Sequence, residues 1–266
     1  MVDATDAISR ARQAVSVRAD LPGMSLMEHL DELRKRLVHS IIYLVLGCIG
    51  AGIFYKQLVA FIQAPLTHIG KSLVFTHPMD PLNLDMQVAL IGGAILASPF
   101  ILYQVWLFIA PGLYQKERRF VVPFMAATVG LFLGGAAFGY YYVLPGAMQI
   151  LIVDFGKNFT PMVTIEEYSS FFLSIILGLG ISFELPILIF FLALFGIVSP
   201  KFLWKNIRYA VLVITLLAAI VTPTPDATTM VLFMGVLLGL YFIGIGVSYM
   251  VVRKREKRLA DESGAS

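Results

Sequence analysis

A single carboxylate, that of Glu184, lies near the middle of an otherwise apolar run from residue 171 to residue 198. About 20 apolar residues in a helix cross the roughly 30 Å hydrocarbon core of a bilayer, so this run is long enough to span it. Charging a carboxyl group at that depth costs about 2.5–3.5 kcal/mol on insertion scales. Pro186 follows and removes the helical donor to the carbonyl of Ser182. Glu184 and Pro186 therefore mark a candidate intramembrane site. The acid either faces water or a polar partner, or only ties helices of its own chain together.

The motifs of common membrane enzymes are absent from the sequence. It contains no Gly-x-Ser-x-Gly, no His-Glu-x-x-His and no Walker loop, so neither an intramembrane protease nor an ATPase has support. His29 and His39 flank the first apolar run on one side, whereas His68 and His77 follow it on the other. The four histidines therefore do not combine the spacing of metal ligands with a place on one side of the membrane. The sequence predicts a protein that is not an enzyme and has no metal or cofactor.

The composition is that of a membrane protein. Of the 266 residues, 58% are hydrophobic and only 14% are charged, whereas a soluble domain carries about 25% charged residues. The mean hydropathy is +0.83. Windows of about 19 residues predict an all-α, polytopic protein with six membrane-spanning helices, at residues 37–54, 84–110, 120–144, 168–198, 209–221 and 227–252. The fifth covers only about 20 Å, so it must recruit flanking residues or lie in a thinned bilayer.

The basic residues predict the orientation of these helices. All but three of the 20 lysines and arginines lie before the first helix, in the second or fourth connection, or in the tail; the exceptions are Lys56, Lys71 and Lys157. By the positive-inside rule, both termini are cytoplasmic. The outer connections contain Pro65, which stiffens the first of them, and Asp226, which with Thr224 is a candidate N-cap of the last helix. We assign structural roles to Pro65 and Asp226.

An amphipathic segment precedes the first predicted span. In residues 25–36, leucines recur on one helical face, which predicts a helix that enters the membrane from its interface. Glu32 can pair with Arg36 at i,i+4. Such surface pairs contribute only a few tenths of a kcal/mol, so the pair alone does not indicate a function.

The residues of this segment, Glu28-His-Leu-Asp-Glu-Leu-Arg-Lys-Arg36, resemble the opening signature of TatC, the polytopic core subunit of the twin-arginine protein translocase. The resemblance extends from about Met24 to Val252. Further motifs recur at matching positions: Ala64-Pro-Leu66, Tyr103-Gln-Val-Trp-Leu-Phe-Ile-Ala-Pro-Gly-Leu-Tyr114, Glu117-Arg-Arg119, Ser182-Phe-Glu-Leu-Pro186 and Thr222-Pro-Thr-Pro-Asp226. The family implies cytoplasmic recognition of signal peptides with two adjacent arginines and export of folded proteins driven by the proton-motive force.

The resemblance also implies a signal-peptide site. Glu32 and Glu117 stand at positions similar to the family's two signal-contacting carboxylates. Carboxylates suit this role because they accept forked hydrogen bonds from a guanidinium group, which a lysine cannot reproduce. We add Arg34 of the opening signature to the candidate site, together with three residues that could line an apolar surface for the signal: Phe108, Leu113 and Tyr114. Interfacial anchoring or loop packing explains those three equally well.

We therefore interpret the chain as a receptor and translocase core of the prokaryotic cytoplasmic (inner) membrane. The implied partners are twin-arginine signal peptides of folded precursors, TatA- and TatB-like single-span subunits, further copies of the chain and the lipid bilayer, with no nucleic acid. Residues 1–23 form a polar extension without an assigned function, residues 24–252 the membrane domain, and residues 253–266 a basic, polar cytoplasmic tail that we expect to be disordered. The alternative is a proton- or ion-coupled secondary transporter that uses Glu184, although its two halves show no matching broken helices.

Overall fold

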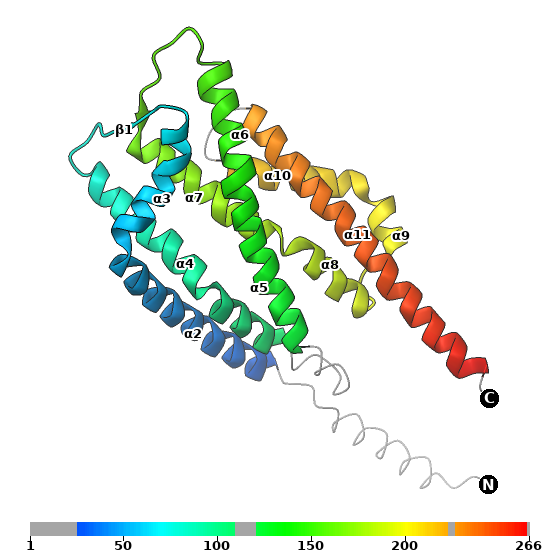
Figure 1. Cartoon of the computed structure of the whole chain (residues 1–266). Helices are drawn as coiled ribbons and strands as arrows, with labels where there is room; N and C mark the ends of the chain where they lie inside the picture. Colours follow the sequence, from blue (N-terminus) through cyan, green and yellow to red (C-terminus); the bar gives the residue numbers. More distant parts are fainter. Residues whose placement is uncertain (1–25, 110–120, 223–226, 265–266) are drawn as a thin grey trace, which may run out of the picture.

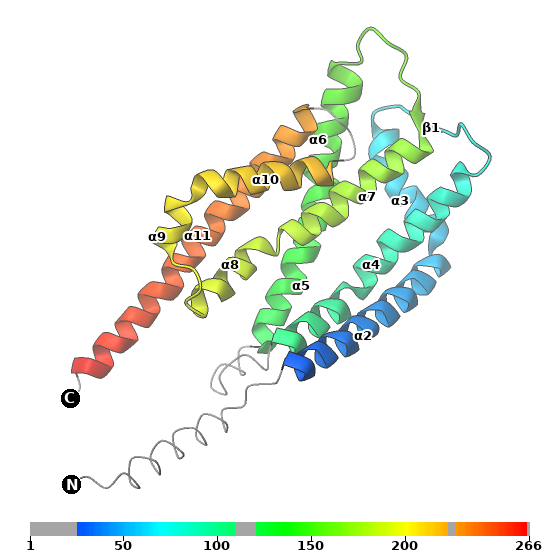
Figure 2. The same ribbon diagram turned by 180° about the vertical axis from the view of Figure 1, so that it is seen from behind.

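The computed structural model describes residues 26–109, 121–222 and 227–264. Within these ranges the chain is a bundle of helices with one very short parallel strand pair (Figures 1 and 2). Helices α2 (Leu26–Ile53) and α4 (Asp80–Ile109) run side by side, and α5 (Val121–Phe138) lies between this pair and α11 (Ala227–Gly264) in both views. Helix α7 (Ile165–Ser182) packs on α5 and α4, and α8 (Leu185–Leu194) packs on α11.

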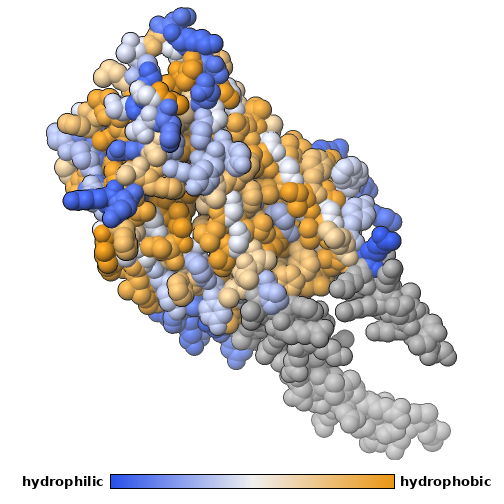
Figure 3. Space-filling model, viewed as in Figure 1, coloured by the Kyte–Doolittle hydropathy of each residue, from blue (hydrophilic) through white to orange (hydrophobic). Residues whose placement is uncertain are grey.

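The all-α, polytopic prediction is confirmed. Five helical segments in the described part of the chain are long and apolar enough to cross a membrane: Met27–Ile53, Asp80–Phe108, Pro123–Asp154, Ile165–Leu194 and Ala227–Arg253. The sixth apolar helix, α10 (Ile207–Val221), has 15 residues and rises only about 22 Å, so it is as short as the sequence predicts. Figure 3 shows a broad apolar surface across the middle of this face, with hydrophilic residues gathered toward its ends.

The third span is longer than the sequence predicts. Instead of ending near residue 144, α5 continues through the π-helical segment η3 (Gly139–Val143), α6 (Leu144–Met148) and a second π-helical segment, η4 (Gln149–Asp154). Pro145 does not stop the helix, because it occupies the first turn of α6, where a missing N–H is tolerated. The two π-helical segments flank α6, one before it and one after it, and the helix runs on through both. The connection to α7 is correspondingly shortened to residues 155–164.

Residues 253–264 also differ from expectation. They continue α11 to Gly264 as helix, whereas the sequence predicts disorder for residues 253–266. The local sequence favours helix, because it contains five lysines and arginines and two glutamates and has no proline or glycine before Gly264.

Two of the connections that the sequence predicts to lie outside are joined to each other. Strand β1 (Leu73–Val74) pairs in parallel with β2 (Val163–Thr164). Thr164 then caps α7, since its side-chain oxygen accepts a hydrogen bond from the backbone N–H of Glu167 at 3.3 Å, as the sequence pattern predicts. The pairing brings together the residues before α4 and those before α7.

Pro65 lies inside the short helix α3 (Tyr55–His68), where it is buried, rather than in an extended loop. A proline there leaves the carbonyl of Phe61 without its helical donor. The hydroxyl of Tyr140 donates to this carbonyl at 2.9 Å, and the hydroxyl of Tyr168 donates to the adjacent carbonyl of Ile62 at 2.5 Å. These two hydrogen bonds tie α3 to η3 and α7. The one from Tyr140 replaces the bond that Pro65 removes, which is consistent with the structural role that we assign to Pro65.

Some glycines lie where two helices approach closely. The i,i+4 spacing of glycines in the sequence identifies only part of these positions. Small-residue pairs at i,i+4 predict close approach at Gly130 and Gly134, at Gly135 and Gly139, and at Gly235 and Gly239. Only Gly135 and Gly139 face a neighbour, α7; the other four have no atom within 4 Å of an added Cβ. A closer approach joins α2 to α4, where a Cβ on Gly47 would lie 2.5 Å from the carbonyl oxygen of Gly93.

The contact at Gly135 predicts a difference between two neighbouring alanine variants. A Cβ on Gly135 would lie 2.6 Å from the carbonyl oxygen of Leu179, so Gly135→Ala should destabilise the fold by about 1–3 kcal/mol. Gly134→Ala is the matched control, because it meets open space and gains helix propensity. Thermal unfolding of the purified protein in detergent measures both. Equal midpoints would show that α5 and α7 are farther apart than described.

Candidate functional site

The carboxylate of Glu32 is held between α2 and α4. Arg36 donates two hydrogen bonds to Glu32 Oε1, from Nε at 2.8 Å and from Nη2 at 2.5 Å. The same guanidinium donates from Nη1 to Oε1 of Gln104, a buried residue of α4, at 3.1 Å. The predicted i,i+4 pair is therefore confirmed, and Gln104 adds a third member that fixes the rigid guanidinium plane across the two helices.

The second carboxylate oxygen of Glu32 has no hydrogen-bond partner among the described residues. Neither of the two Arg36 bonds involves Oε2, and the side chain of Glu32 is 20% exposed. An ionised carboxylate has about four acceptor positions and can accept a fork of two N–H groups from an arginine. The described part of the chain thus presents a carboxylate that is oriented on one side and open on the other.

An aromatic contact adjoins this carboxylate. Phe108 lies one helical turn beyond Gln104, and its ring stacks on that of His29 with centroids 4.4 Å apart and planes inclined by 26°. His29 lies one turn before Glu32 on α2. These five residues (His29, Glu32, Arg36, Gln104 and Phe108) form one surface at the ends of α2 and α4, which we call the Glu32 cluster. Sequence reasoning missed His29 and Gln104, because only the packing of α2 on α4 places them there.

Arg34 does not belong to the Glu32 cluster. Two residues along a helix correspond to a rotation of about 200°, so Arg34 faces away from Glu32. It is exposed and lines a shallow depression together with Asp31, Lys35, Val38 and His39. The prediction that Arg34 shares a site with Glu32 is therefore not supported by this geometry.

Four predicted residues lie outside the described ranges. Leu113, Tyr114 and Glu117 belong to residues 110–120, which connect α4 to α5, and Asp226 belongs to residues 223–226, which connect α10 to α11. Their roles stay predictions. The bounds of the neighbouring helices agree with the sequence at both places, since α4 ends at Ile109 and α11 begins at Ala227.

Glu184 lies at the break between α7 and α8. Its backbone N–H donates to the carbonyl of Ile181 at 3.0 Å, and its own carbonyl accepts from Leu188 at 2.9 Å. Pro186 is buried in the first turn of α8, so the predicted interruption of this span is confirmed. The side-chain Oε1 of Glu184 is buried and has no hydrogen-bond partner among the described residues. In this part of the chain the acid therefore does not tie its own helices together.

The described ranges contain one group of side chains that could ligate a metal, and the spacing of these residues in the sequence does not indicate it. Ligand atoms of His77, Asp80 and Glu166 lie within 4.8 Å of one another, because the β1–β2 pairing joins segments that are about 90 residues apart. Asp80 Oδ2 already accepts the backbone N–H groups of Thr76 and His77 at 2.8 and 2.9 Å. This loop-capping role explains the buried carboxylate without a cation.

The chain is similar to proteins of one family along nearly its whole length. Residues 28–235 match the family model described as Sec-independent protein translocase protein (TatC). A TatC protein of Koribacter versatilis is 49% identical over 91% of this chain and 92% of its own length. The TatCy protein of Bacillus subtilis is 36% identical over 91% of this chain and 96% of its own length.

The fold is likewise similar to solved structures. A crystal structure of the twin-arginine translocase receptor TatC superposes with a TM-score of 0.78 at 35% identity, covering 84% of this chain and 99% of that one. A second crystal structure of that receptor, in the detergent DDM, gives a TM-score of 0.76 at 36% identity. The residues that match the family model, 28–235, include both Glu32 and Glu184. The chain belongs to the TatC family of Sec-independent protein translocases and is a multi-pass protein of the bacterial inner membrane.

Proposed function

We propose that the Glu32 cluster, together with Glu117, is the surface on which this translocase receptor docks twin-arginine signal peptides. The observation that supports the proposal is the asymmetry of the Glu32 carboxylate, whose Oε1 is fixed by Arg36 and whose Oε2 accepts no hydrogen bond from the described part of the chain. An incoming guanidinium finds an acceptor that is already oriented, so less side-chain entropy is lost on binding. A lysine ammonium offers no planar fork and gains less from the same acceptor.

The remainder of the docking surface follows from the neighbours of Glu32. Glu117 takes the second arginine of the signal, a role that rests on the family resemblance. The stacked rings of Phe108 and His29 give an apolar surface next to the charged pair, suited to the hydrophobic segment that follows the arginines. Leu113 and Tyr114, which follow Phe108 in the sequence, stay part of the proposed surface. We leave Arg34 out of it, because it faces the other side of α2.

The orientation and the partner contacts are part of the same proposal. Both termini lie in the cytoplasm, which puts the Glu32 cluster on the side where precursors arrive. Helix α10 packs on α11 and leaves a row of large apolar side chains exposed: Tyr209, Leu212, Leu216 and Ile220. We propose that single-span subunits related to TatA and TatB bind to this row. We also propose that the proton-motive force drives transport. The transporter alternative has no support, because every relative described above is a translocase component.

Site-specific photocrosslinking tests both docking and orientation. A photoreactive amino acid at position 32, in inverted membrane vesicles that expose the cytoplasmic face, should form adducts with an added twin-arginine precursor. The same amino acid at position 34 is the matched control, since it lies two residues away on the opposite face. A twin-lysine precursor should reduce the adducts at position 32.

Two outcomes would contradict the proposal. Adducts that form in right-side-out vesicles but not in inverted ones would reverse the orientation. Equal adducts from positions 32 and 34 would show that the signal does not select the face of α2 that carries Glu32.

A further inference from the structure

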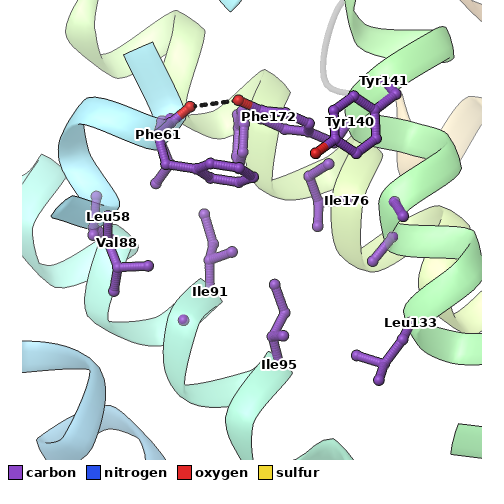
Figure 4. Close-up of a pocket in the computed structure, with 14 residues that line it drawn as sticks. Leu58, Phe61, Val88, Ile91, Ile95, Leu133, Tyr140, Tyr141, Phe172 and Ile176 are labelled. Atoms are coloured by element: carbon purple, nitrogen blue, oxygen red, sulfur yellow. Dashed lines mark hydrogen bonds between the residues drawn. The ribbon is translucent and has the colours of Figure 1, made fainter. Parts of the chain in front are cut away.

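An apolar cavity of about 270 Å³ lies between α3, α4, α7 and the junction of α5 with η3 (Figure 4). It is separate from the Glu32 cluster and from Glu184. Its walls are aliphatic, with the side chains of Leu58, Val88, Ile91, Ile95, Leu133 and Ile176 directed toward the hollow.

One pair of polar atoms beside the cavity is satisfied at its upper wall. The rings of Phe61 and Tyr140 stack there with centroids 4.1 Å apart and planes inclined by only 7°. The hydroxyl of Tyr140 donates to the carbonyl of Phe61, the group that Pro65 leaves without a helical donor. In Figure 4 this bond lies above the hollow, so the interior is left without a free donor or acceptor from this pair.

The cavity opens toward the surroundings of the helices. Four of its lining residues are exposed: Ala137, Leu133 at 38%, Phe61 at 46% and Tyr141 at 66%. Helices α4, α5 and α7 belong to segments that are long and apolar enough to cross a membrane, so we infer that the opening faces lipid. Tyr140, Tyr141 and Tyr142 follow one another beside the opening, an arrangement typical of the aromatic belt at a membrane interface.

We propose that this cavity binds one acyl chain of a phospholipid from the leaflet at the β1–β2 end of the molecule. Apolar cavities of about 150 Å³ already bind ligands such as benzene, so a larger one with hydrocarbon walls suits a chain segment. A partner helix does not fit, because one helical turn with its side chains fills about 400 Å³. The lipid headgroup lies at the level of the tyrosines, whose hydroxyls prefer that interface.

Photoreactive phospholipids test this assignment. The full-length chain is reconstituted in vesicles containing a phospholipid with a diazirine in one acyl chain, illuminated, and its adducts are mapped by mass spectrometry. We expect adducts on Ile91, Ile95 and Ile176 in excess of those on Leu90 and Leu96, which face outward from α4. Nonspecific annular lipid would instead label the outward residues more strongly.

A cavity-filling variant with a matched control makes the result specific. Ala137 is exposed and lies at the rim, so Ala137→Trp should fill the cavity without disturbing buried contacts and should lower the cavity adducts by about fivefold or more. Ala126→Trp is the control, since Ala126 is exposed on the same helix and does not line the cavity. Leu133→Trp at the rim is a second filling variant in case the first fails to fold.

The proposal is overturned if the buried lining residues are labelled no more than Leu90 and Leu96, or if folded filling variants keep their full labelling. Loss of the cavity adducts on reconstitution with the single-span subunits would assign the hollow to a partner side chain and would also overturn it. None of these outcomes depends on signal-peptide docking, so the test is independent of the proposed function.

Discussion

Replacing Glu117 by alanine should weaken binding of a twin-arginine precursor by about 30-fold or more. Removal of one partner from a desolvated carboxylate–arginine pair typically costs 2–5 kcal/mol, whereas a pair at an exposed rim contributes far less. The effect should appear in the dissociation constant of a fluorescent precursor, measured at equal amounts of folded receptor. An unchanged dissociation constant for Glu117→Ala would remove this residue from the docking surface.

The parallel change Glu32→Ala should give a smaller loss of affinity. Arg36 already donates two hydrogen bonds to Oε1 of Glu32, so part of the negative charge is compensated before the signal arrives. Arg34→Ala serves as the matched control, because this side chain faces away from the cluster and its loss should leave the affinity within about twofold. A larger loss from Arg34→Ala than from Glu32→Ala would place the docking surface on the other face of α2.

Replacing Glu184 by alanine should abolish most transport while leaving precursor binding intact. Its buried Oε1 has no partner among the described residues, although a buried polar group normally has one. We therefore propose that water or a polar residue of a partner subunit supplies the missing hydrogen bond, and that the break between α7 and α8 exposes the acid to it. Glu184→Gln keeps a carbonyl oxygen and hydrogen-bond donors, so it should retain much of the transport.

Transport of a folded precursor into inverted vesicles measures both Glu184 variants, with Leu188→Ala as a control for truncation of an exposed residue on α8. Assembly with the single-span subunits is followed in the same preparations. If Glu184→Gln stops transport as fully as Glu184→Ala while assembly is intact, the hydrogen-bond role is wrong. A proton that binds and leaves during transport would then be the better explanation.

The sequence by itself determined the features that depend on neighbouring residues. Apolar runs long enough to cross a bilayer predict the spans, and the shortness of α10 follows from its residue count alone. The pair between Glu32 and Arg36 follows from helical periodicity, as does the capping of α7 by Thr164. The bend at Pro186 follows from its missing N–H.

The tertiary structure alone decided which helix faces meet. Spacing shows that two glycines share a face but not whether another helix lies against it. A Cβ added to Gly135 would meet α7, whereas one added to Gly130 would meet no other element within 4 Å. Gln104 reaches Arg36 from 68 residues away, because α4 packs along α2. The open oxygen of Glu32 and the apolar cavity likewise arise between elements that are distant in the chain. Such contacts depend on packing, which local periodicity does not encode.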